Sequence, residues 1–191
     1  MTSVLKVDNI QNSSGTQAMN IHSSGFIIPP AGGIIQMQYT QFTSTSSTAI
    51  TASTDTVLTD LTVNITPTST NSIIRLEAQV YGEFSNRGQT WDSVLFFYRD
   101  STKLSHPVSG NRNVGVASML LNHESDSLST AEGSAMFQYF DSPSSTSQIT
   151  YKVGIRTNTG VTLNLNRTVS DTDAHNYERY VSSIIATEIA G

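Results

Sequence analysis

Apolar and polar residues alternate along several stretches of this chain, and this period-two pattern constrains its fold more than any other feature. In residues 74–80 every second side chain is apolar, and the same pattern recurs in 61–65, 149–155 and 161–165. Successive side chains of a β-strand point to opposite faces of a sheet, so each stretch predicts a strand with one buried and one solvated face. Other apolar, β-branched or aromatic stretches predict strands at about 34–43, 93–100, 114–122, 134–141 and 180–189.

These strands predict an all-β fold, because no crossover helix of a parallel sheet separates them. Residues 180–189 also fit helical spacing, but their β-branched and aromatic content favours a strand. The Thr157–Gly160 connection is short and ends in glycine, which predicts a hairpin between the strands on either side of it. We therefore expect an antiparallel, jelly-roll-like β-sandwich over residues 34–191.

Residues 1–33 differ from this body and predict a separate N-terminal arm. A stiff spacer, Pro29-Pro30, is followed by Ala31 and the flexible pair Gly32-Gly33, which marks the boundary. The arm is expected to form a small hairpin or to be extended, and in either form it needs a partner surface. Its expected docking residues are the apolar ones: Val4, Leu5, Val7, Ile10, Met19 and Ile21.

The composition excludes several classes of protein. Charged residues make up 13% of the 191 residues, about half the usual fraction, and Ser and Thr together supply 53. The ten Lys and Arg residues against fifteen Asp and Glu give a net charge of -5, which provides no basic stripe for nucleic acid. There is no cysteine for a disulfide or a zinc-thiolate site, and no apolar run long enough to cross a membrane. A secretory signal is not expected either.

Three predicted strands are apolar on both sides: 94–98, 116–121 and 136–140. A single sandwich leaves one face of each sheet in water, so such strands need a second cover. A loop or helix of the same chain could supply it, but with no convincing helix in the sequence we favour packing between subunits. The expected interface residues are Leu95, Phe97, Met119, Leu121, Phe137 and Tyr139.

Nothing in the sequence indicates catalysis. The nucleophile elbow, the zinc-protease helix and the phosphate-binding glycine loops are all absent, and the four histidines, His22, His106, His123 and His175, lie in separate segments. Asp171, Asp173 and His175 are the sharpest polar cluster, but their spacing lacks the glycine and terminal glutamate of a calcium loop. Solvated carboxylates or an Asp–Arg179 contact are favoured there. We therefore predict no catalytic residue, no metal and no cofactor.

An aromatic cluster around residues 82–89 suggests a sugar-binding alternative. Tyr81, Arg87 and Trp91 lie in or next to this loop, and an exposed aromatic ring can stack on a sugar. The competing interpretation is that Tyr81 and Trp91 fill the core of the sandwich. A glycoside hydrolase is the enzymatic rival and requires two carboxylates that converge in a cleft.

Four segments suggest a family. Residues 3–15, 61–72, 96–100 and 166–188 together resemble the small virion-associated proteins of tailed bacteriophages, especially those that infect marine bacteria and cyanobacteria. The resemblance implies a structural, usually trimeric component of the virion whose N-terminal segment docks on the particle, and it implies no catalytic residue.

The sequence thus predicts a non-enzymatic phage structural protein on the particle surface. Its expected partners are copies of itself, as a homotrimer, and a capsid or tail protein. Capsid decoration or a short head fibre is favoured over a long tail fibre, because the repeats or heptads of a shaft are missing. The alternative is a fibre tip that binds a receptor or glycan on the host.

Overall fold

The computed structural model describes residues 7–21, 25, 27–85, 92–108, 110–121, 133–175 and 177–191. Over these residues the chain is all-β, and every strand pairing is antiparallel. The strands are β1 (Asn9–Gln11), β2 (Gln17–Ile21), β3 (Ile27–Ile28), β4 (Ile34–Phe42), β5 (Ser46–Ile50), β6 (Thr56–Ile65), β7 (Ile73–Phe84), β8 (Val94–Arg99), β9 (Thr102–Leu104), β10 (Leu120–Leu121), β11 (Gly133–Asp141), β12 (Ile149–Arg156), β13 (Val161–Leu165) and β14 (Ser182–Ile189).

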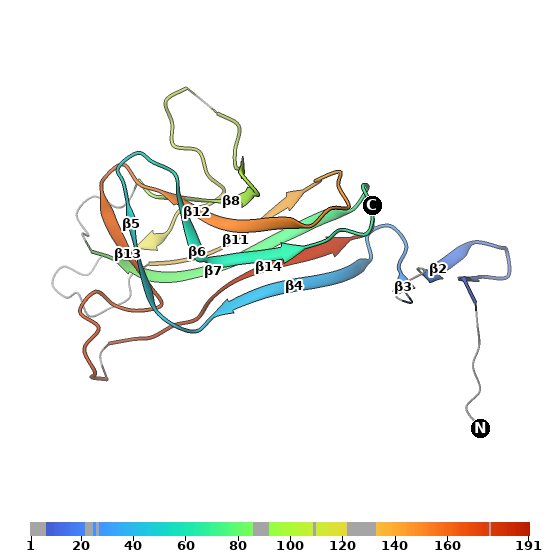
Figure 1. Cartoon of the computed structure of the whole chain (residues 1–191), viewed down its shortest axis with the longest axis horizontal. Coiled ribbons are helices and arrows are strands. Elements are labelled where there is room, and N and C mark those ends of the chain that lie inside the picture. The colour runs from blue at the N-terminus through green and yellow to red at the C-terminus, as the bar shows by residue number, and fades with distance from the viewer. Residues whose placement is uncertain are drawn as a thin grey trace.

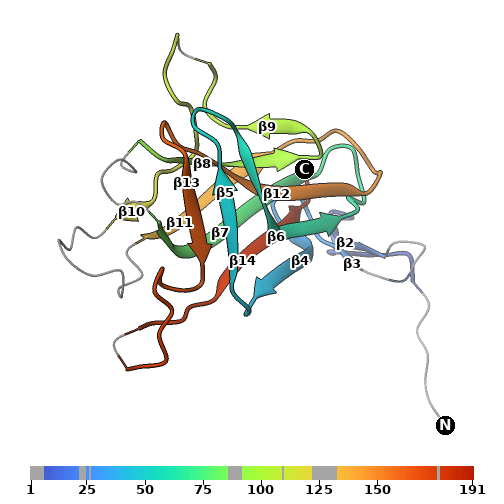
Figure 2. The ribbon, with the colours of Figure 1, turned by 60° about the vertical axis from the view of Figure 1, so that its left-hand side comes forward.

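Two sheets form the body of the molecule. The large sheet runs β10-β11-β7-β13-β5, and β14 joins it by pairing with β7 on one side and with β4 on the other. The small sheet runs β6-β12-β8-β9 and covers the large one (Figures 1 and 2). The predicted antiparallel sandwich is confirmed, including a strand rather than a helix at the C-terminus. The likeness to a jelly roll stays a prediction.

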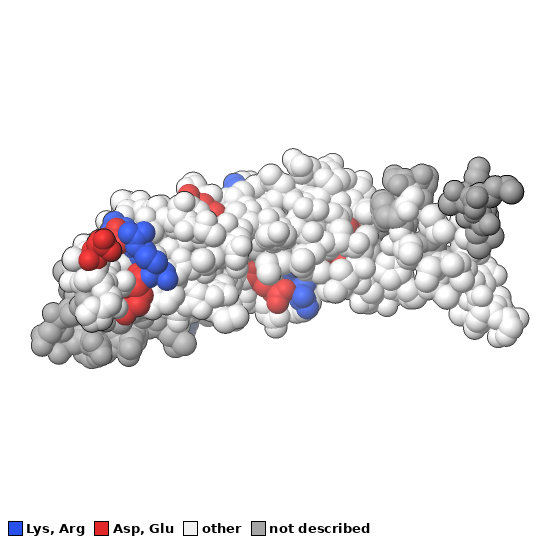
Figure 3. Space-filling view, turned by 90° about the horizontal axis from the view of Figure 1, so that it is seen from below, with Lys and Arg blue, Asp and Glu red and all other residues white. Residues whose placement is uncertain are grey.

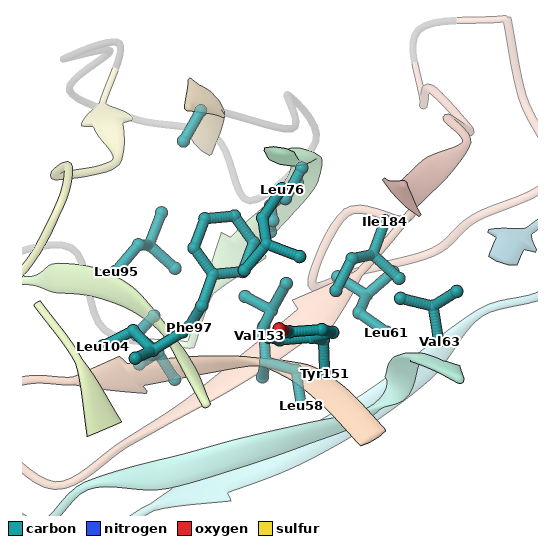
Figure 4. Packing of buried hydrophobic residues seen from close by; sticks show 14 of the residues in the cluster. Leu58, Leu61, Val63, Leu76, Leu95, Phe97, Leu104, Tyr151, Val153 and Ile184 are labelled. Atoms are coloured by element: carbon teal, nitrogen blue, oxygen red, sulfur yellow. The ribbon is translucent and has the colours of Figure 1, made fainter. Parts of the chain in front are cut away.

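The core lies between the two sheets, where the period-two pattern places it. Along β7 the side chains of Ile74, Leu76, Ala78 and Val80 are buried, and the residues between them are half-exposed. Figure 4 shows apolar side chains of β6, β7, β8, β12 and β14 converging between the sheets. Burying one such side chain contributes about 1.5–3 kcal/mol, so the alternation of this one strand decides which face of the large sheet turns inward.

The apolar strand β8 has its second cover within its own chain, so this strand does not require the packing between subunits that its sequence suggested. Leu95 and Phe97 point into the core, whereas Phe96 lies on the opposite face and is nevertheless fully buried. Its register partner on β12 is Gly154, and a Cβ atom at Gly154 would lie 2.3 Å from the Phe96 ring. The ring thus occupies the space that glycine leaves open, and the ammonium group of Lys103 lies over it, 3.8 Å from the ring centroid.

The predicted hairpin at Thr157–Gly160 is wrong. β12 belongs to the small sheet, and β13 pairs with β5 and β7 in the large sheet, so the connection crosses from one layer to the other. Backbone hydrogen bonds hold the crossing, since Ser53 donates to the carbonyl of Thr157 at 2.7 Å. A glycine-ended turn therefore permits a change of sheet as readily as a hairpin.

The strands β1, β2 and β3 form a small third sheet, so this part of the chain is not a fully extended arm. This N-terminal sheet lies beyond the ends of β4 and β14, outside the sandwich (Figure 1). The connecting segment is tied to the end of β14, because Gly32 donates to the carbonyl of Ala190 at 2.7 Å and Ala190 donates to Gly33 at 2.8 Å. The predicted spacer is thus anchored on its sandwich side.

A buried carboxylate stabilises this same end of the sandwich. Glu188 is on the inner face of β14 and is fully buried. It accepts hydrogen bonds from the hydroxyl of Ser72 at 2.6 Å, from the backbone N–H and hydroxyl of Thr68 at 2.7 and 2.8 Å, and from Gln36 at 2.6 Å. Burial acts to raise the pKa of Glu188, but these bonds outweigh it and hold the pKa below its ordinary value of 4.5.

We predict that Glu188→Gln lowers the free energy of unfolding at pH 7 by about 2 kcal/mol, since the amide cannot accept all of these bonds. A carboxylate whose pKa is lowered by folding stabilises the protein above its unfolded pKa and loses this contribution as the pH falls through the folded pKa. The difference between wild type and variant in urea unfolding should therefore shrink below about pH 4.5. The control is Glu77→Gln on the exposed face of β7; an equal loss there would contradict the assignment.

Candidate functional site

Tyr151 is a fully buried ionisable group, and its surroundings are structural. Its hydroxyl donates to Asp141 Oδ2 at 2.7 Å, and Arg99 Nη1 lies 2.9 and 3.1 Å from the two Asp141 oxygens. Burial, and next the bond to Asp141, raise the pKa of Tyr151 far above its ordinary value. A phenol in this state keeps its proton at neutral pH, so the group joins β12 to the end of β11 and is no proton acceptor.

The loop before β14 forms ion pairs among its own residues. Asp171 contacts Arg179 at 2.7 Å and Arg167 at 3.8 Å, which is the Asp–Arg contact favoured from the sequence. Asp173 and His175 are exposed. Within the described part of the chain, no three His, Cys, Asp or Glu side chains gather closely enough to hold a metal ion. That part of the chain also contains no helix of the length and apolar character that spanning a membrane would require.

Three of the predicted docking residues, Ile10, Met19 and Ile21, lie on the N-terminal sheet, and Val7 lies just before it. Val7 and Ile10 are exposed, whereas Met19 and Ile21 are half-buried, and Ile10 is the register partner of Met19. Ile27, which the sequence reasoning did not include, is also more than half exposed. Two further predicted residues, Val4 and Leu5, fall outside the described residues. The sheet therefore presents apolar side chains to solvent.

The predicted interface residues lie mainly in the core, and for three of them the prediction is wrong. Leu95, Phe97 and Met119 are buried within the single chain and cannot reach another subunit. Phe137 and Tyr139 point to the same side, and the Phe137 ring lies 4.8 Å from that of Phe97. The side chain of the sixth predicted residue, Leu121, falls outside the described ones.

In β11 the exposed apolar side chains belong to the neighbouring positions, which point to the outer face of the large sheet. Met136 and Phe140 of β11 are 77% and 55% exposed. On the opposite edge of this face, Met37 and Tyr39 of β4 are 56% and 65% exposed. Seen from the side of β4, most of the surface carries no charge, and charged side chains gather mainly at the end away from the N-terminal sheet (Figure 3).

Strand register makes this outer face continuous. One row across the sheet joins Met37, Thr187, Arg75 and Phe140, and the next joins Tyr39, Ile185, Glu77 and Gln138. In its middle, Arg75 and Glu77 form an ion pair of 2.9 Å. Between β7, β11 and β14 the face is hollowed by about 350 Å³ around Gln79, Met136 and Ile185. The face combines apolar edges with a neutral, paired centre.

Of the three residues predicted to contact a glycan, the structure describes only Tyr81. Tyr81 is half-buried and stacks on Tyr180 with ring centroids 5.0 Å apart, and its hydroxyl accepts a hydrogen bond from Gln79 at 2.6 Å. Its ring is therefore engaged within the chain. Arg87 and Trp91 fall outside the described residues.

No protein-family model matches this chain, and no curated protein is significantly similar to it. The candidate sites are therefore inferred from the structure alone. They are two apolar surfaces: the N-terminal sheet and the outer face of the large sheet.

We predict that Tyr151→Phe lowers the free energy of unfolding by about 1–2 kcal/mol, because it removes a hydrogen bond to a charged, buried acceptor and leaves the packing of the ring intact. Thermal and urea unfolding of the purified protein measure the loss. Tyr180→Phe is the matched control and should change stability little, because its ring contributes the stacking contact. Equal stability of Tyr151→Phe and wild type would contradict the role of this bond.

Proposed function

We propose that the protein is a non-enzymatic structural component of the virion of a tailed bacteriophage, attached to the particle through its N-terminal sheet. The observation that carries this proposal is the position of β1, β2 and β3, which stand outside the sandwich (Figure 1), with the side chains of Ile10 and Ile27 exposed. Such surfaces are uncommon on free proteins and mark sites of interaction. The sequence resemblance to virion-associated proteins supports the same role.

The connection between the two parts suits an attachment. Pro29 and Pro30 restrict the backbone of the spacer, and the paired hydrogen bonds of Gly32 and Gly33 with Ala190 hold its end against β14. Gly33 also packs closely on Pro29, because a Cβ atom there would lie 2.4 Å from the proline ring. The sandwich would thus be held in a defined direction relative to the docked N-terminal sheet, as capsid decoration or a short head fibre requires.

The proposal includes self-association through the outer face of the large sheet, with three copies as the expected number. The partner that covers this face is another copy of this chain, because the face is complementary to an identical face. Its exposed Met and aromatic residues supply apolar contact, and the Arg75–Glu77 pair makes its centre neutral although the chain carries a net charge of -5. Two such faces therefore meet without the repulsion that the net charge would otherwise produce.

We predict that deletion of residues 1–28 yields a folded sandwich that no longer joins particles. The core strands lie outside the deleted segment, so the midpoint of thermal unfolding of the sandwich should stay within a few degrees of wild type. Mass spectrometry of particles purified from infected cells measures incorporation. The full-length variant with Ile10→Asp and Ile27→Asp serves as the matched test, since it keeps the length of the chain. Normal incorporation of both variants would reject the docking role.

We predict that Met136→Asp combined with Phe140→Asp weakens self-association by about a hundredfold, because both charges would be buried in the contact. Sedimentation velocity and light scattering over a range of protein concentrations measure the oligomer. Val108→Asp is the control, since Val108 is 85% exposed but lies on the loop after β9. A monomeric wild-type protein at high concentration would contradict the proposed interface.

A further inference from the structure

The outer face of the large sheet carries an exposed aromatic side chain at its edge and a hollow nearer its middle. Tyr39 stands on the edge strand β4 and is 65% exposed. The hollow of about 350 Å³ lies across β14, β7 and β11, and Tyr39 is not part of its lining. A large aromatic side chain left in water beside an apolar face is typical of a protein interface.

Strand register places Tyr39 and the hollow at the same position along the strands. The row that starts at Tyr39 continues with Ile185 on β14 and Glu77 on β7. It ends with Gln138 on β11, and these three partners all line the hollow. Neighbouring strands lie about 4.8 Å apart, so the middle of the hollow, on β7, is about 10 Å to the side of Tyr39. The two features therefore differ in position across the sheet but not along it.

The lining of the hollow suits a tyrosine ring. Met136 and Ile185 offer apolar contact to the ring, and the side-chain amide of Gln79 or Gln138 can accept a hydrogen bond from a phenol hydroxyl. Among the described residues that line the hollow, Glu77 alone carries a charge, and Arg75 pairs with it at 2.9 Å. An aromatic ring that enters the hollow thus buries no unpaired charge.

The next row along the strands agrees with the first. Met37 precedes Tyr39 on this face of β4, and its row ends at Phe140 on β11. A rotation about an axis parallel to the strands leaves positions along the strands unchanged. It therefore brings Met37 of one copy level with Phe140 of the next when Tyr39 meets the hollow. An axis perpendicular to the strands would reverse the rows, place Met37 level with Met136, and leave Phe140 in water.

We propose that Tyr39 of one copy enters the hollow of the next copy, and that the copies are related by a rotation axis parallel to the strands. This inference rests on the self-association proposed above and assigns its contact and direction. Because Tyr39 and the hollow are separate parts of one face, each copy receives one neighbour and enters another, and the contact closes into a ring. 

The direction of the axis determines where the N-terminal sheets lie. The strands β4, β14 and β7 run along the length of the sandwich, and the N-terminal sheet lies beyond one end of it (Figure 1). Rotation about an axis parallel to these strands places the N-terminal sheets of all copies at the same end of the ring. Every copy of the ring can then dock on the same surface.

The test is disulfide cross-linking of introduced cysteines, since the chain has no cysteine of its own. Two full-length double variants place both cysteines in one row and keep Tyr39: Met37→Cys with Phe140→Cys, and Gln41→Cys with Met136→Cys. Within one chain each pair is three strands apart, about 14 Å, whereas a disulfide requires Cα atoms within about 7 Å. A bond therefore joins different copies. Mild oxidation should give reducible species of two and three chains on electrophoresis.

The matched control is Met37→Cys with Met136→Cys, which uses the same two strands two rows out of step. Its cysteines stay about 14 Å apart along the strands in the proposed arrangement. We therefore expect at least tenfold less cross-linked product than from the two variants with both cysteines in one row. Equal or greater cross-linking of the control would show that neighbouring copies run in opposite directions, and it would overturn the inference while self-association remains.

Sedimentation velocity of the reduced proteins separates this inference from the proposal on which it rests. An oligomer that gives no cross-link in either variant with both cysteines in one row would overturn the Tyr39 contact alone, whereas a monomeric wild-type protein would remove both. Tyr39→Ala should weaken self-association by about tenfold, and Tyr39→Phe should retain most of it, because the ring supplies the buried contact. Equal self-association of Tyr39→Ala and wild type would also contradict the inference.

Discussion

The arrangement of the whole molecule depends on β7, because this one strand separates the core from the largest exposed face. It pairs with β11 along one edge, and with β14 and then β13 along the other. Its inner side chains, among them Ile74, Leu76 and Val80, are completely buried. Its outer side chains, from Arg75 to Tyr81, form the centre of the outer face. A shift of register by one residue would exchange the two sets, so the burial of the inner set determines where the exposed apolar surface lies.

Period-two patterning made most of this architecture predictable. Regular alternation locates β7, β12 and β13, because half of each strand is apolar and half polar. The orientation of strands with apolar residues on both sides is harder to predict, since their pattern does not indicate which side faces the core. In β11 both Phe137 and Phe140 are apolar, and only the partners across the sheet show that Phe137 points inward. This ambiguity is why the predicted interface residues fell on the buried side.

The complementary sizes of paired side chains on neighbouring strands explain why the sequence did not predict how β8 is covered. Phe96 needs no other subunit because Gly154 opposite it leaves a space that the ring fills. The pairing of a bulky residue with a glycine depends on the register between β8 and β12, which are more than fifty residues apart in the sequence. The same limit applies to the ion pairs of Asp55. Asp55, Lys103 and Arg156 lie in three separate segments, and no local pattern indicates that they meet.

The pairing of charged side chains determines the character of the exposed faces. Several charged side chains that the structure describes form ion pairs, such as Arg99 with Asp141 and Arg179 with Asp171, and such pairing leaves broad faces neutral. Neutral, apolar faces favour contact between protein copies, which is the property a structural component of a particle needs.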